Sequence, residues 1–189
     1  IIGGIMGPIL QSNGLANQEV FNTGAKLVAG QNAAIVTNQF VDQFITFGGS
    51  GLTLGLVCTM LYFSKSRQYK ELGKLSIIPG LFNINEPIIF GFPVVFNPIM
   101  AIPFILAPVI SVIMVYTSIA TGIVEPFRAI SVPWTTPFII SGFLIGGVKA
   151  AILQIAVFSM TVAVYFPFFK YQDKLAYQEE QKIGTEATV

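Results

Sequence analysis

A single acidic residue stands inside a long apolar stretch, flanked by amides and interrupted by prolines. Residues 80–98 read Gly-Leu-Phe-Asn-Ile-Asn-Glu-Pro-Ile-Ile-Phe-Gly-Phe-Pro-Val-Val-Phe-Asn-Pro, and Glu86 is the acid. A carboxylate in hydrocarbon costs roughly 2.5–3.5 kcal/mol on membrane-insertion scales, so we expect Glu86 to face a cavity or a partner. There it could bind a substrate hydroxyl and take up its proton. The alternative is that Glu86 only caps a helix.

The prolines limit the backbone that can carry this acid. Each proline lacks an N–H and clashes with the preceding turn, so no uninterrupted helix runs through Pro87, Pro93 and Pro98. Asn85-Glu86-Pro87 instead resembles a helix start, because proline suits the first helical position and a polar residue before it can cap exposed N–H groups. At membrane depth, broken backbone is tolerated only where protein buries it or where it lines a wet cavity. We therefore expect a re-entrant hairpin with Glu86 near its tip.

The composition is that of a membrane protein. Hydrophobic residues make up 53% of the chain and charged residues 10%, whereas a soluble domain carries roughly 25% charged residues. The net charge of +1 gives no electrostatic case for nucleic-acid binding. The chain has no histidine and one cysteine, Cys58, so neither a metal site nor an intrachain disulfide is expected. It begins with Ile1, and we expect it to be part of a longer protein.

The N-terminal third divides into segments of different polarity. Residues 1–10 are apolar and suit either the second arm of another re-entrant hairpin or a frayed helix end. Residues 11–42 are richer in Asn and Gln, and their patchy apolar residues predict an interfacial or partly inserted helix. Residues 43–64 have no charged side chain and are long enough to span a bilayer. Glycines in this segment, with Gly49 next to Ser50, would let a ligand or another backbone approach closely; close helix packing alone is the alternative.

Charge sets the expected topology of the remainder. Residues 65–74 carry four basic residues against one acid, which predicts a cytoplasmic loop. Residues 99–124 and 151–169 are long apolar spans. Residues 129–148 contain Trp134 between two prolines, and we expect them to dip into the membrane and return. A full crossing would place the basic tail outside, against the positive-inside tendency.

Two smaller features complete the survey. Glu125 and Arg128 fall three residues apart, where side chains on a helix can meet, so we expect an ion pair at the far membrane surface. The polar tail from Tyr171 is expected to be ordered only in its first turns.

Together these segments predict an all-α integral membrane protein with about three full transmembrane helices plus re-entrant hairpins, part of a larger helix bundle. Residues 1–42 would form the end of a hairpin and an interfacial helix. Residues 43–170 would form the transmembrane binding region, and residues 171–189 a polar cytoplasmic tail.

The ordered motifs resemble one family. Phe82–Gly91 followed by Asn97-Pro98 is similar to the signature of the lactose/cellobiose/diacetylchitobiose family of bacterial phosphotransferase-system permeases, the enzyme IIC component. Ile5–Pro8, residues 48–54 and residues 133–137 are similar to other motifs of that family in the same order. The likeness covers essentially the whole chain. It implies a multi-pass protein of the bacterial plasma membrane, a homodimer, and a sugar-binding histidine just upstream of residue 1.

The resemblance implies that the protein moves a disaccharide of the cellobiose, chitobiose or lactose type while the sugar is phosphorylated. The phosphate would come from a cysteine of the IIB partner at the cytoplasmic face, so whether this chain is itself an enzyme stays open. Cys58 lies mid-span and is not that cysteine. Glu86 is the candidate catalytic residue, with no cofactor. The candidate substrate-binding residues are Asn83, Asn85, Glu86, Gly91, Trp134, Gly49 and Ser50.

Other readings of the same residues stay open. Trp134 could be an interfacial belt residue, which is common for tryptophan in membranes. The protein could be an ion-coupled secondary transporter, since such transporters also use broken helices and a midplane acid. It could also be a structural membrane module that binds no sugar. Dependence of uptake on a phosphorylated partner, rather than on a proton gradient, would separate a phosphotransferase permease from an ion-coupled transporter.

Overall fold

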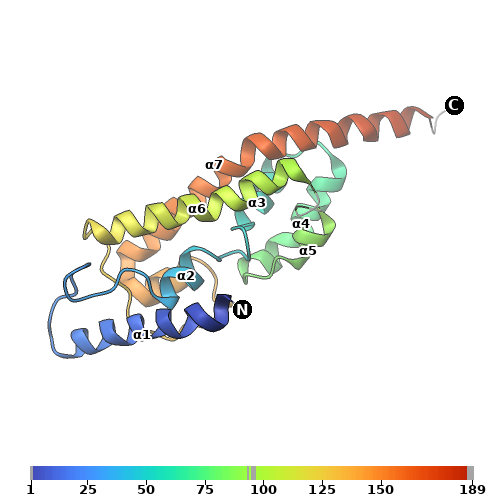
Figure 1. The fold of residues 1–189 in the computed structure, drawn as a ribbon. Helices are drawn as coiled ribbons and strands as arrows, with labels where there is room; N and C mark the ends of the chain where they lie inside the picture. Colours follow the sequence, from blue (N-terminus) through green and yellow to red (C-terminus); the bar gives the residue numbers. More distant parts are fainter. Residues whose placement is uncertain (1, 93, 95–96, 187–189) are drawn as a thin grey trace. The chain divides into compact units, whose positions relative to one another are not determined.

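The computed structural model describes residues 2–92, 94 and 97–186, and in that part of the chain every extended regular element is a helix (Figure 1). This confirms the all-α prediction. The helices are α1 (Ile2–Asn22), α2 (Asn38–Phe44), α3 (Leu54–Phe63), α4 (Arg67–Leu81), α5 (Glu86–Gly91), α6 (Pro98–Ala120) and α7 (Ile140–Glu186).

Two of the described helices, α6 and α7, are long and apolar enough to cross a membrane. α7 contains the span predicted over residues 151–169, whereas α6 ends at Ala120, four residues before the end of the span predicted over residues 99–124. The backbone of α7 is broken at Gly146 and Gly147, whose dihedral angles are not helical. Residues 129–148 therefore form no uninterrupted helix, and their dip into the membrane stays a prediction.

A full span over residues 43–64 is not formed, which corrects that prediction. The helix in this stretch, α3, has ten residues. At 1.5 Å per residue it is about 15 Å long, roughly half the thickness of a bilayer core. Gly48, Gly49 and Gly51 adopt positive φ angles between α2 and α3, as does Leu52, so the helix cannot continue through them.

Other local expectations also change. Residues 2–22 form one helix through Pro8, so the apolar start and the more polar stretch after it share one element. The hairpin arm predicted over residues 1–10 stays a prediction. The predicted ion pair between Glu125 and Arg128 is wrong, since the one ion pair among the described residues joins Lys74 and Glu71. Both residues lie outside helices, where a spacing of three does not bring side chains together. The Arg128 guanidinium lies instead 3.9 Å from the centre of the Phe21 ring, a cation–π contact. The tail beyond Tyr171 continues α7 as far as Glu186, so it is more ordered than expected.

The chain forms two compact units, each assembled from two stretches of sequence. Unit 1 comprises Ile1–Phe47 and Val109–Val157, and unit 2 comprises Gly48–Pro108 and Phe158–Val189. The chain passes between the units at residues 47/48, between α2 and α3, and again inside α6 and inside α7. Each of these two long helices therefore contributes to both units.

Buried amides hold the loops of unit 1. Asn17 is fully buried on α1 and donates to the carbonyl oxygens of Ala34 and Phe127, at 2.9 and 2.8 Å. Its Oδ1 accepts from the Ala34 N–H at 2.8 Å. One side chain thus ties two irregular segments to α1, satisfying backbone groups that have no helical partner.

A second buried amide, Gln154 on α7, does the same for another loop of unit 1. Its Oε1 accepts from the N–H groups of Ile139 and Gly142, at 2.6 and 2.9 Å. Its Nε2 donates to the Gln43 carbonyl at 2.7 Å and to the Ser141 hydroxyl at 2.9 Å. The full hydrogen-bonding capacity of this amide is used, and it fixes the start of α7 against the end of α2.

In unit 2, two carboxylates of α7 hold the loop that leads into α4. Asp173 is 1% exposed and accepts from the Ser64 hydroxyl and from the N–H groups of Lys65 and Ser66, at 2.7–3.0 Å. About two turns further along α7, Glu180 accepts from the Ser66 hydroxyl and from the first N–H groups of α4. These carboxylates satisfy donors that a helix start leaves unpaired, so α7 determines where α4 begins.

Candidate functional site

The turn that carries the candidate site begins at Asn83, two residues after the end of α4. The φ angle of Asn83 is +66°, a left-handed conformation in which asparagine is tolerated better than most residues. The Asn83 N–H donates to the Gly80 carbonyl at 3.1 Å, and the Ile84 N–H donates to the Pro79 carbonyl at 3.0 Å. This pair of bonds is the Schellman motif, which closes the end of a helix. The second asparagine of Asn-Ile-Asn then comes directly before α5.

The turn after α4 meets a second turn from a distant part of unit 2. We call residues 48–52 the glycine turn. The Gly48 N–H donates to Asn83 Oδ1 at 2.5 Å, and Asn85 Nδ2 donates to the Ser50 carbonyl at 3.0 Å. The two asparagines therefore hold the glycine turn, 35 residues away in sequence, against the start of α5.

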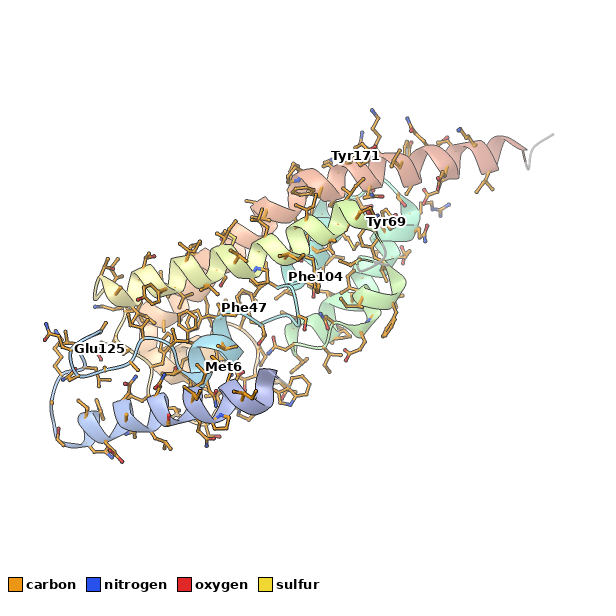
Figure 2. The ribbon with its side chains drawn as sticks, viewed as in Figure 1. Met6, Phe47, Tyr69, Phe104, Glu125 and Tyr171 are labelled. Carbon is orange, nitrogen blue, oxygen red and sulfur yellow. The ribbon has the colours of Figure 1, made fainter. Side chains whose placement is uncertain are left out.

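Gly49 is glycine because of this contact. Its φ angle is +89°, and a Cβ added there would lie 2.3 Å from Asn85 Cγ. The next glycine, Gly51, lies against Phe104 of α6, where an added Cβ would lie 2.3 Å from the ring; Figure 2 labels this phenylalanine. The Gly51 carbonyl accepts from the Tyr165 hydroxyl at 2.6 Å. The glycine turn is thus fixed by α6, by α7 and by Asn85.

Glu86 is the first residue of α5, and its side chain is exposed. The helix start predicted at Asn85-Glu86-Pro87 is confirmed, with the proline in the first turn. The Asn85 side chain does not cap α5, because its Nδ2 donates to the Ser50 carbonyl. The backbone carbonyl oxygen of Asn85 accepts the first helical bonds, from the N–H groups of Ile88 and Ile89. The carboxylate therefore lies beside a fixed polar turn.

Gly91 has a packing partner. A Cβ at this position would lie 2.5 Å from Leu72 Cδ1, so the end of α5 opposite Glu86 approaches α4 closely. This contact accounts for the glycine without a ligand, and we leave Gly91 out of the site proposed below.

Trp134 belongs to unit 1, in the irregular segment before α7, and 63% of its side chain is exposed. Within unit 2 the structure brings the glycine turn, with Gly49 and Ser50, against Asn83 and Asn85, and Glu86 follows Asn85 directly in the sequence. Trp134 belongs to unit 1.

A polar cavity in unit 1 was not predicted from the sequence. It has a volume of about 290 Å³, and its lining includes Gln39, Asp42, Gln43 and Ser131. Burial raises the pKa of the Asp42 carboxyl above its usual range. The Oε1 atoms of Gln39 and Gln43 are buried without a hydrogen-bond partner. The only advance signal was the abundance of Asn and Gln in residues 11–42.

The sequence model of the family described as "Phosphotransferase system, EIIC" matches residues 1–108. The chain belongs to this family. It is 49% identical over 185 residues to the cellobiose-specific EIIC component of Geobacillus stearothermophilus, covering 96% of this chain and 40% of that protein. It is 43% identical over 185 residues to the lichenan permease IIC component of Bacillus subtilis (strain 168), covering 97% of this chain and 40% of that protein.

A solved structure is similar over almost the whole EIIC chain. It is the crystal structure of the transporter ChbC, the IIC component of an N,N'-diacetylchitobiose-specific phosphotransferase system. The two are 42% identical with a TM-score of 0.89, over 95% of this chain and 41% of that one. The EIIC chain thus spans about 40% of the length of these relatives. Its membership and its two apolar helices place it in the bacterial plasma membrane.

The contact between the EIIC glycine turn and Asn85 gives a first prediction. Gly49→Ala should be more destabilising than Gly24→Ala. Both glycines have similar positive φ angles, +89° and +80°, but nothing lies within 4 Å of a Cβ at Gly24. Gly24→Ala should cost only the backbone strain, about 1–2 kcal/mol. Gly49→Ala should cost about 1–3 kcal/mol more, because overpacking adds to that strain.

The measurement is thermal unfolding of the two full-length variants in detergent. Equal shifts of the melting temperature would contradict the predicted contact between the glycine turn and Asn85.

Proposed function

We propose that this chain is the sugar-binding part of a phosphotransferase-system permease, which translocates a disaccharide as it is phosphorylated by a IIB partner. The observation that carries the proposal is the convergence of the glycine turn with Asn83, Asn85 and the exposed Glu86 in unit 2. Relatives with specificity for cellobiose and diacetylchitobiose support a substrate of that class. Nothing in these relatives favours an ion-coupled transporter.

Sugar recognition needs polar groups at fixed positions. Gly49 and Ser50 present backbone groups, while Asn83 and Asn85 fix that backbone through their side chains. We assign direct contact with a sugar hydroxyl to Glu86. Trp134 lies in unit 1, and its stacking on an apolar sugar face stays a separate prediction from the sequence. Asn83 and Asn85 act in this scheme chiefly as positioning residues, because each already bonds to the glycine turn.

Phosphoryl transfer to a hydroxyl depends mainly on positioning and on where the proton goes. In the proposed step, the S–P bond to the cysteine of the IIB partner breaks as the bond from the sugar oxygen to phosphorus forms. The hydroxyl proton passes to the Glu86 carboxylate, and the cysteine leaves as a thiolate.

The α4–α5 hairpin would be re-entrant and would carry Glu86 to the sugar. Three of the four basic residues predicted in a loop over residues 65–74 lie on α4, which begins at Arg67. This basic segment would lie on the cytoplasmic side that receives the partner. A homodimer is part of the same proposal.

The experiment is sugar binding and phosphorylation by the full-length protein, comparing wild type with Glu86→Gln. Labelled cellobiose and diacetylchitobiose are the probes, with a phosphorylated IIB protein as donor. Glu86→Gln should slow phosphorylation about 10²- to 10⁴-fold, the usual contribution of a general base, and should weaken sugar binding. Glu71→Gln is the matched control, since this acid is exposed on α4 and pairs with Lys74 at 2.7 Å.

Normal binding and phosphorylation by Glu86→Gln would return this residue to a capping role. Failure of wild type to bind either sugar would contradict the assignment of these disaccharides as substrates.

A further inference from the structure

The apolar parts of α3 and α7 end at the same level of unit 2. The helix α3 ends at Phe63, and the uncharged part of α7 ends at Phe169. Lys170 Nζ donates to the Phe63 carbonyl at 3.4 Å, and the Asp173 carboxylate accepts from the Lys65 N–H. The first polar turn of α7 therefore lies beside the first polar residues after α3. A membrane surface would cross unit 2 at this level, on the side that the basic residues of segment 65–74 assign to the cytoplasm.

A groove with a volume of about 520 Å³ lies at this boundary. Its lining side chains come from the loop after α3 and from one face of α7. They are Lys65, Lys170, Asp173, Lys174, Tyr177 and Gln178. We call this site the lysine groove.

The lysine groove carries uncompensated positive charge. Its one acid, Asp173, is buried and is already engaged by three donors of the loop before α4. No ammonium group of the groove forms an ion pair with a carboxylate in the described part of the chain. Lys170 lies over the Phe166 ring, 5.8 Å from its centre, which keeps its ammonium group at the membrane end of the groove. The site is therefore suited to an anion with several acceptor oxygens.

Aromatic side chains around this level indicate which anion fits. Tyr62 is 80% exposed, Phe63 43% and Tyr171 54%, and Figure 2 labels Tyr171 on α7. Exposed aromatic rings at the ends of spans are typical of the membrane–water interface. Lysines at this depth attract anionic lipid, whose headgroup remains in the interface while its chains stay in hydrocarbon. A free anion or a soluble acidic protein would make no use of the adjacent apolar surface.

We propose that the lysine groove binds the phosphate headgroup of an anionic phospholipid of the cytoplasmic leaflet. The three ammonium groups would pair with the phosphodiester, and Tyr177 and Gln178 would bond to the remaining headgroup oxygens. The bound lipid would add a further link between the loop before α4 and α7.

The test is direct binding of fluorescent phosphatidylglycerol to the full-length protein in detergent, with phosphatidylcholine as the neutral comparison. Wild type should prefer phosphatidylglycerol. The triple variant Lys65→Gln/Lys170→Gln/Lys174→Gln should bind it about a hundredfold more weakly, since each lysine contributes roughly fivefold. The triple variant Lys26→Gln/Lys149→Gln/Lys182→Gln removes the same charge elsewhere and should change binding less than about threefold. Restoring charge as Lys65→Arg/Lys170→Arg/Lys174→Arg should keep the preference.

Three results would overturn the proposal. Equal effects of the two glutamine triples would show that only net charge matters. Displacement of the lipid by inorganic phosphate at matched concentration would show a site for free phosphate. Loss of IIB binding with unchanged lipid binding would show a protein-docking surface. If the triple variant does not fold, the single variant Lys174→Gln at an exposed position replaces it in the binding assay. Its affinity for phosphatidylglycerol should be about fivefold lower than that of wild type.

Discussion

Replacing Asp173 with alanine should lower the free energy of unfolding by on the order of 3–5 kcal/mol, the cost of breaking a buried charged interaction. The substitution removes the acceptor for the Ser64 hydroxyl and for the N–H groups of Lys65 and Ser66. Asp173 is 1% exposed, so water does not readily replace the lost partner. Each buried donor left unpaired costs about 1–3 kcal/mol. Chemical or thermal unfolding of the full-length protein in detergent measures the loss.

Two variants test the cause of that loss. Asp173→Asn keeps one oxygen acceptor and should cost about half as much as alanine. Glu71→Ala removes an exposed carboxylate whose ion pair with Lys74 is at the surface, and it should cost less than about 1 kcal/mol. If Asp173→Ala were no more destabilising than Glu71→Ala, the proposed support of α4 by α7 would be incorrect.

The second large effect concerns Gln154. Replacing it with leucine should also lower the free energy of unfolding by on the order of 3–5 kcal/mol. Leucine has a similar volume but leaves the N–H groups of Ile139 and Gly142 and the carbonyl of Gln43 without partners. These groups are backbone atoms and cannot be removed from the site, so each retains its desolvation cost of about 1–3 kcal/mol. The loss should appear as a lower melting temperature of the full-length protein.

Gln172→Leu is the matched control for Gln154→Leu, with the same change on the same helix. Gln172 is half-buried and donates one bond of 3.2 Å, to Asn97. Gln172→Leu should lower the free energy of unfolding by less than about 1.5 kcal/mol, the typical net value of one hydrogen bond. Similar losses from the two substitutions would mean that the Gln154 amide is not the support inferred for the start of α7.

The sequence predicted the parts of the site that depend on neighbouring residues. The Asn-Glu-Pro motif marks the start of α5 because proline and a preceding polar residue act within one turn. The membership in the EIIC family was also recognisable from the order of its motifs. The hydrogen bonds that bring Ser50 to Asn85 could not be predicted, because they join residues 35 positions apart and no local preference encodes them.

The predictions for residues 43–64 and for the tail beyond Tyr171 were wrong for physical reasons. Residues 43–64 are uniformly uncharged, so hydropathy alone suggested one span, although the cluster of glycines at Gly48, Gly49 and Gly51 signalled a possible break. The acids of the tail suggested a solvated segment, since nothing near Asp173 or Glu180 in sequence shows that their partners lie in the loop before α4. Those partners are 107–114 residues away.

This separation has a consequence for the order in which the protein is made. The donors at Ser64 and Lys65 are synthesised long before the Asp173 carboxylate that accepts from them, 108–109 residues later. At about 5–20 residues per second, the ribosome needs on the order of 5–20 seconds to bridge that gap. During this time the loop before α4 has its hydrogen-bond donors but neither of the α7 carboxylates that accept from them. Unit 2 can therefore be completed only after nearly all of this chain has been translated.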